Sequence, residues 1–125
     1  MTEKSKTAVA YICTSLPQEH PDRAAQVEQQ RKAIIACAVL RDAEIVAEFI
    51  DYGIASDSFS WFPQYHQMID YLKETIIDFV IIENLSRMVR EGIDLPEMLS
   101  QVNQAGTVLV TASPDEGIRD FEQPF

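Results

Sequence analysis

Short apolar segments recur along the chain and are separated by longer amphipathic ones. The apolar segments are rich in Val, Ile and Thr. They are nearly continuous rather than alternating, which is typical of strands buried on both faces of a parallel sheet. They predict four strands, at Thr7–Thr14, Glu44–Asp51, Asp78–Glu83 and Thr107–Ala112.

The intervals between these strands carry apolar residues at helical spacing. Proline suits the first turn of a helix, and glycine commonly closes one. Residues 84–92 are expected to form a loop or a short turn of helix. Three helices are predicted: from a cap at Asp22 to about Leu40, from Pro63 through the stripe Tyr65, Met68, Ile69 and Leu72, and from a capping-box-like start at Asp94 and Glu97 to Gly106.

Strands that alternate with helices predict an α/β fold, in which a mostly parallel sheet of four to five strands has helices on both faces. We expect a flexible N-terminus at residues 1–6, one domain over residues 7–113 and an irregular C-terminal tail at residues 114–125. In such sheets, functional side chains gather at the carboxyl ends of the strands.

Composition narrows the classes of function. The formal net charge of −10 argues against strong DNA binding by this segment alone, because neutralising phosphates needs clustered Lys and Arg. No secretory signal or membrane-spanning run is evident, so a cytoplasmic protein without a membrane partner is expected. Cys13 and Cys37 are expected to be reduced, and His20 and His66 stand alone without metal-ligand spacing.

Several α/β enzymes are poorly supported. No glycine-rich phosphate loop follows the first strand, and no GxSxG nucleophile elbow occurs. A phosphate-accepting receiver domain has a similar layout, but it needs acidic residues after the first strand and an aspartate at the end of the third. This chain has Cys-Thr-Ser and Glu-Asn at those places.

The remaining candidates are one hydroxyl and two guanidinium groups. Ser15 ends the first predicted strand on the same side as Tyr11 and Cys13, because side chains alternate along a strand. Arg87 and Arg90 are three residues apart and share a face on a helical turn. Taken singly, these are ordinary turn and surface residues. Together at one edge, they suit the attack of a hydroxyl on a phosphodiester that arginines hold.

These segments, in this order, resemble the serine recombinase (resolvase/invertase) family. AVAYICTS is similar to a first strand that reads Tyr-x-Arg-x-Ser and ends in the nucleophile, and WFPQYHQMI is similar to an Arg-Pro-Gly-Leu helix start. GTVLVTASPDEGIRD is similar to the fourth strand and the segment before the long dimer helix. The other matched positions are Tyr11 and Ser15 in the first strand, Gln30 in VEQQRKAI, Asp51 and Gly53 in EFIDYGIAS, and Arg87 and Arg90 in IIENLSRMVR.

The resemblance implies a mechanism without metal or other cofactor. The Ser15 hydroxyl would attack a DNA phosphate to form a 5′-phosphoserine link and a free 3′-hydroxyl, with Arg87 and Arg90 stabilising the transition state. Tyr11, Gln30, Asp51 and Ser86 would support this active site. DNA is the implied partner, with a further basic domain or partner chain, and a homo-oligomer is expected in the full-length context.

The chain departs from the family pattern at three positions. Cys13 and Phe62 stand where the family has arginine, and Ser86 stands where it has aspartate. Neither Cys nor Phe can replace the hydrogen bonds of arginine to phosphate, so weakened cleavage is expected; Arg23 or Arg31 would be the substitutes. The family's long dimerisation helix is not evident after Asp120, which leaves an excised domain or a stand-alone remnant as interpretations.

Three hypotheses remain open from the sequence. The first is a recombinase catalytic domain, active or weakened. The second is a non-catalytic resolvase-like module that acts through protein contacts or regulation, and the acidic composition and missing arginines favour it. The third is an unrelated doubly wound α/β protein. Whether the chain is an enzyme is left undecided.

Overall fold

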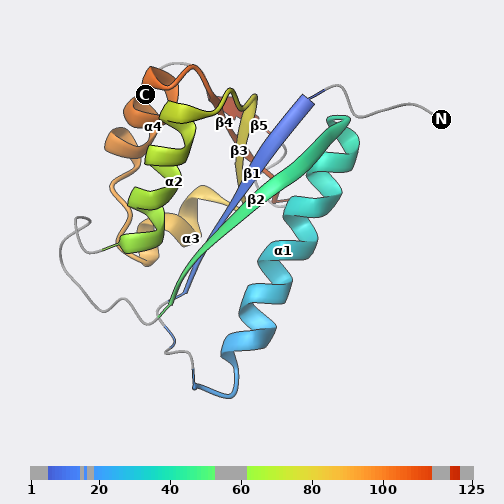
Figure 1. Cartoon of the computed structure of the whole chain (residues 1–125). Coiled ribbons are helices and arrows are strands. Elements are labelled where there is room, and N and C mark those ends of the chain that lie inside the picture. Colours follow the sequence, from blue (N-terminus) through green and yellow to red (C-terminus); the bar gives the residue numbers. More distant parts are fainter. Residues whose placement is uncertain (1–5, 15, 17–18, 53–61, 114–118, 122–125) are drawn as a thin grey trace.

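A five-stranded sheet forms the centre of the molecule, in the order β2-β1-β3-β4-β5 (Figure 1). All pairs are parallel except β4–β5, which is antiparallel. The computed structural model describes residues 6–14, 16, 19–52, 62–113 and 119–121. The strands are β1 (Lys6–Thr14), β2 (Ala43–Tyr52), β3 (Phe79–Ile82), β4 (Val108–Thr111) and β5 (Arg119–Phe121).

Helices cover both faces of this sheet. In the described part of the chain, α1 packs on one face, and α2, α3 and α4 pack on the other (Figure 1). The predicted α/β architecture, a mostly parallel sheet with helices on both sides, is therefore confirmed. The helices are α1 (Arg23–Leu40), α2 (Pro63–Glu74), α3 (Leu85–Arg90) and α4 (Leu95–Gln104).

β1 is the strand on which both halves of the core are built. Seven consecutive residues, from Ala8 to Thr14, are buried. Because successive side chains point to opposite faces, Ala8, Ala10 and Ile12 pack with α1. Val9, Tyr11 and Cys13 pack into the second core with residues of α2, α3 and α4.

Some boundaries and caps differ from the sequence predictions. Residues 84–92 contain a true helix, α3, whose first turn is capped when Asn84 Oδ1 accepts the Arg87 amide at 2.6 Å. Asp94 caps α4 as predicted, by accepting the Glu97 amide at 3.1 Å. Asp22 occupies the N-cap position of α1, but its side chain accepts no capping hydrogen bond among the described contacts.

The last strand was not predicted. β5 lies within the C-terminal stretch for which irregular structure is expected, and it pairs antiparallel with β4. At three residues it is too short to leave a periodic apolar signal. An ion pair between Arg41, at the end of α1, and Asp120 attaches β5 to the rest of the fold.

A buried carboxylate joins three of these elements. Asp51, at the end of β2, is 2% exposed and accepts the Tyr11 hydroxyl of β1 at 2.7 Å. It also accepts the backbone amides of Gln64 and Tyr65 in the first turn of α2, at 2.9 and 3.0 Å. These amides have no partner within the helix, so Asp51 caps α2 from a neighbouring strand.

No helix in the described part of the chain combines the length and apolar character needed to cross a membrane. The longest helix, α1, has 18 residues. Its sequence includes Arg23, Glu28, Arg31 and Lys32, and its buried face is the narrow stripe that packs on the sheet.

We predict that Asp51→Ala destabilises the fold by about 3 kcal/mol or more, because it leaves a buried hydroxyl and two helix amides without their acceptor. Tyr11→Phe removes only one of these hydrogen bonds and should cost about 1.5 kcal/mol. Urea unfolding monitored by circular dichroism measures both values. Equal effects of the two substitutions would contradict the role of Asp51 as the cap of α2.

Candidate active site at the carboxyl edge of the sheet

The predicted site residues belong to elements that meet at one edge of the sheet. β1, β2 and β3 are parallel neighbours, so their carboxyl ends lie at the same edge. α3 follows β3 there and carries Arg87. Ser15 lies outside the described residues, as do Gly53 and the side chain of Arg90. Arg90 is the last residue of α3, and its backbone is described.

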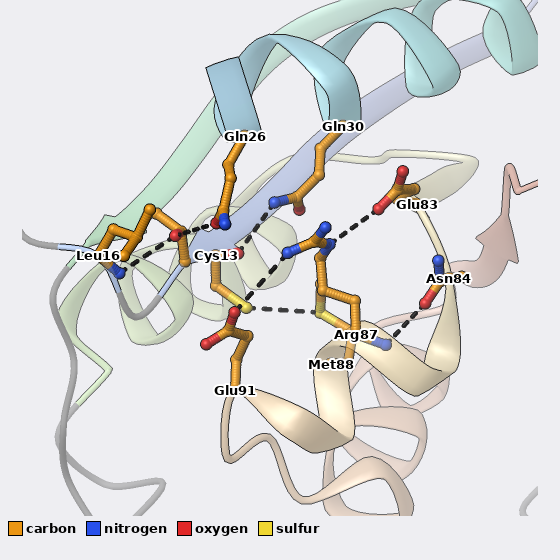
Figure 2. Close-up of polar contacts among 10 residues, drawn as sticks. Cys13, Leu16, Gln26, Gln30, Glu83, Asn84, Arg87, Met88 and Glu91 are labelled. Carbon is orange, nitrogen blue, oxygen red and sulfur yellow. Dashed lines mark hydrogen bonds and ion pairs between the residues drawn. The ribbon is translucent and has the colours of Figure 1, made fainter. Parts of the chain in front are cut away.

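Two carboxylates hold the Arg87 side chain (Figure 2). Its Nε donates to Glu83 Oε1 at 2.9 Å, and its Nη1 lies 3.7 Å from Glu91 Oε2. The three side chains are only 9–13% exposed, so solvent screens their charges weakly. The guanidinium is therefore held in place, and one positive charge is shared between two negative ones.

Cys13 lies beside this charged cluster, at the end of β1. Its Sγ is 3.8 Å from Met88 Sδ, and the residue is 1% exposed (Figure 2). Burial raises the pKa of the Cys13 thiol far above its usual range, the charges of Glu91 and Asp51 raise it further, and Arg87 opposes them. The thiol is thus protonated at neutral pH and does not act as a nucleophile.

Phe62, the second position where the resemblance implies arginine, is also closed to solvent. It is 0% exposed and belongs to the same apolar cluster as Cys13 and Met88. Both substitutions therefore extend the hydrophobic core into the edge of the sheet. Whether these positions reduce phosphate binding stays a prediction; the structure shows only that both side chains are buried.

Two glutamines of α1 hold the end of β1. Gln30 Nε2 donates to the Cys13 carbonyl at 3.0 Å, and Gln26 Oε1 accepts from the Thr14 hydroxyl at 2.6 Å (Figure 2). Gln30 is fully buried, and its Oε1 has no hydrogen-bond partner among the described residues. The pattern on the helix indicated Gln30. It missed Gln26, which is four residues earlier on the same face.

The other supporting residues have separate surroundings. The Tyr11 hydroxyl donates to Asp51, and Asp51 accepts two backbone amides of α2, so these contacts link β1, β2 and α2. Ser86 lies on the exposed side of the first turn of α3. The structure brings Cys13, Gln30 and Arg87 together, whereas Tyr11 and Asp51 brace the adjoining helix.

Neither of the two proposed substitute arginines lies in the Arg87 cluster. Arg31 forms a two-pronged ion pair with Glu48 of β2, with both distances at 2.8 Å, and it also pairs with Glu28. The Arg23 guanidinium lies 5.1 Å from the centre of the Tyr52 ring, at the end of β2. Both arginines therefore have partners near the edge strand.

The sequence interpretation did not single out Glu83 and Glu91. A signal was present, because Glu83 and Glu91 lie four residues before and after Arg87; in the structure they flank the two ends of the short helix α3. Within the described ranges, no group of three or more His, Cys, Asp or Glu residues could hold a metal ion. The charged cluster consists of one arginine, Arg87, between two carboxylates, Glu83 and Glu91.

Comparison with known proteins establishes the family. The family described as "Resolvase, N terminal domain" matches residues 8–125 of the chain. This chain belongs to that resolvase family. A search of curated protein sequences finds no match.

Solved structures share the fold. A resolvase family site-specific recombinase from Streptococcus pneumoniae superimposes with a TM-score of 0.72 at 24% identity, covering 93% of this chain and 76% of that one. The N-terminal catalytic domain of TP901-1 integrase gives 0.66 at 13% identity, covering 86% and 78%. The C-terminal catalytic domain of ISC1926 TnpA, an IS607-like serine recombinase, gives 0.63 at 17% identity, covering 89% and 70%.

We predict that neither cysteine reacts with a disulfide reagent in the folded protein at pH 8. Burial raises the pKa of both thiols, so both stay protonated as well as inaccessible. In denaturing urea, both should react quickly, and absorbance of the released thiolate measures the extent. Rapid reaction of one thiol in the native protein would contradict this picture of Cys13 and Cys37.

Proposed function

We propose that this chain is the catalytic-type domain of a serine recombinase that cuts and rejoins DNA, with weakened chemistry. The observation that carries the proposal is the placement of Arg87. Glu83 and Glu91 hold its guanidinium beside Cys13, the residue two positions before Ser15 (Figure 2). A phosphate bound to Arg87 would lie near the carboxyl end of β1, which Ser15 follows in the sequence.

In the proposed reaction, the Ser15 hydroxyl oxygen forms a bond to the phosphorus of a DNA phosphodiester. The serine hydroxyl gives up its proton, the bond from phosphorus to the 3′ oxygen breaks, and this oxygen takes up a proton, so the step consumes no net proton. The products are a 5′-phosphoserine link and a free 3′-hydroxyl, and the reverse attack rejoins the strand. One phosphoester bond replaces another, so the step needs neither ATP nor an oxidant.

Arg87 and Arg90 would stabilise the negative charge that grows on the phosphoryl oxygens. Cys13 and Phe62 cannot contribute, because both are buried and neither has a cationic group. If each missing donor costs about a hundred- to a thousandfold in rate, the two together raise the barrier by about 5–8 kcal/mol. We therefore propose slow cleavage.

The acidic net charge of the chain bears on how it would reach DNA. With a net charge of −10, the chain gains little affinity from DNA phosphates on its own. We propose that a basic segment or partner brings DNA to this domain, that a homo-oligomer places two such sites on a duplex, and that the protein works in the cytoplasm.

A second function is favoured by the same cluster. Glu83 and Glu91 neutralise Arg87, and the core closes over Cys13 and Phe62. A resolvase-like module with these features could act through protein contacts alone. This alternative predicts that no covalent link to DNA forms.

The test is the trapping of that link. The chain is incubated with a pool of randomised DNA duplexes nicked to prevent rejoining, and products are separated under denaturing conditions. We expect a slow band that protease removes, that is lost in Ser15→Ala, and that falls at least about a hundredfold in Arg87→Ala. Ser100→Ala, on α4, is the matched control and should leave the band unchanged.

Two results would contradict the proposed cleavage. One is the absence of any protease-sensitive band in the wild-type chain, which would favour the non-catalytic alternative. The other is a band that persists in Ser15→Ala, which would assign the link to a different nucleophile.

A further inference from the structure

The charged cluster has more negative than positive charge. Glu83 precedes Arg87 by four residues and Glu91 follows it by four, so one guanidinium lies between two carboxylates. All three side chains are largely buried: the exposed fraction is 13% for Arg87, 9% for Glu83 and 12% for Glu91. Charges in such surroundings interact more strongly than they would on an open surface.

The two carboxylates contact Arg87 in different ways. Glu83 accepts a hydrogen bond from Nε at 2.9 Å, which fixes the plane of the guanidinium. Glu91 stands 3.7 Å from Nη1, too far for a good hydrogen bond. Glu83 therefore orients the arginine, whereas Glu91 mainly neutralises it and is the easier of the two to displace.

The pKa of the Cys13 thiol responds to the charges of this cluster. After burial, the strongest influence on the pKa of its thiol is the negative charge of Glu91, and Asp51 acts in the same direction. Arg87 acts in the opposite direction with a smaller effect. At the Cys13 thiol, the two carboxylates thus outweigh the arginine that lies beside it.

We propose that Glu91 is an internal competitor for Arg87, and that it lowers the affinity of this edge of the sheet for phosphate. Carboxylate and phosphate oxygens use the same N–H groups of a guanidinium. An incoming phosphate must therefore displace Glu91 from Nη1, while Glu83 keeps the guanidinium oriented. That the phosphate belongs to DNA rests on the proposed function; the competition itself does not.

The test measures binding of inorganic phosphate and of dimethyl phosphate to the whole chain, by NMR shifts of the backbone amides of α3. Glu91→Gln keeps the size of the side chain and removes its charge. We expect it to tighten phosphate binding by about tenfold, the value of one charge-assisted hydrogen bond. Glu83→Gln should tighten binding less, because it also releases Nε.

Two controls separate a local effect from a general one. Glu44→Gln, on the exposed start of β2 at the opposite end of the sheet, makes the same change in net charge and should leave binding within about twofold of wild type. In the double variant Glu91→Gln/Arg87→Ala, the gain should disappear. Circular dichroism verifies that each variant is folded.

The inference is overturned if Glu91→Gln binds phosphate no more tightly than wild type, if the gain survives the loss of Arg87, or if Glu83→Gln tightens binding as much. The outcome is independent of cleavage. Phosphate binding that tightens as expected, together with no Ser15-dependent DNA link, would defeat the proposed function and leave the competition by Glu91 standing.

Discussion

Burial of β1 on both faces is the constraint on which the arrangement depends. Its even-numbered apolar residues pack on α1, and its odd-numbered ones pack against the helices of the other face. Because side chains alternate along the strand, the Cys13 side chain points to the same face as Val9 and Tyr11, toward α3 with Met88 and Arg87. The glutamines of α1 then fix the end of the strand through Cys13 and Thr14. The site is thus a product of core packing, and its polar groups are added at the edge of a rigid strand.

At that edge, buried apolar side chains adjoin a cluster of charged ones. Cys13 and Phe62 fill space with apolar atoms where the family resemblance implies guanidinium groups. Arg87 has two carboxylates as close partners, and the pKa of the neighbouring Cys13 thiol is influenced more by Glu91 than by Arg87. We propose that an arginine neutralised in this way attracts phosphate weakly. The fold is that of a recombinase domain, and we propose that the electrostatics at this edge support only slow phosphoryl transfer.

Much of the fold could be predicted from pattern. The four parallel strands and the helices α1, α2 and α4 were predicted, because each has a long apolar run or a clear helical stripe. β5 was not predicted, since a strand of three residues is too short to show an alternating or continuous apolar pattern. Among site residues, Gln30 could be predicted from its place on a buried helix face. Glu83 and Glu91 were overlooked, because a charged residue at helical spacing is ordinarily a surface residue. In the structure both side chains are largely buried beside Arg87, which their spacing along the chain does not show.

The coupling between Arg87 and Glu83 is the most direct measurement of whether a held, neutralised arginine lies at the end of β1. A double-mutant cycle compares the free energy of unfolding of Arg87→Ala, Glu83→Ala and the double variant. If these side chains form a buried, oriented pair, the coupling energy should be about 1–3 kcal/mol. A coupling of about 0.3 kcal/mol or less, the level of an exposed surface pair, would contradict it. Arg87 would then be a solvated cation, and the neutralised site at the end of β1 would not exist.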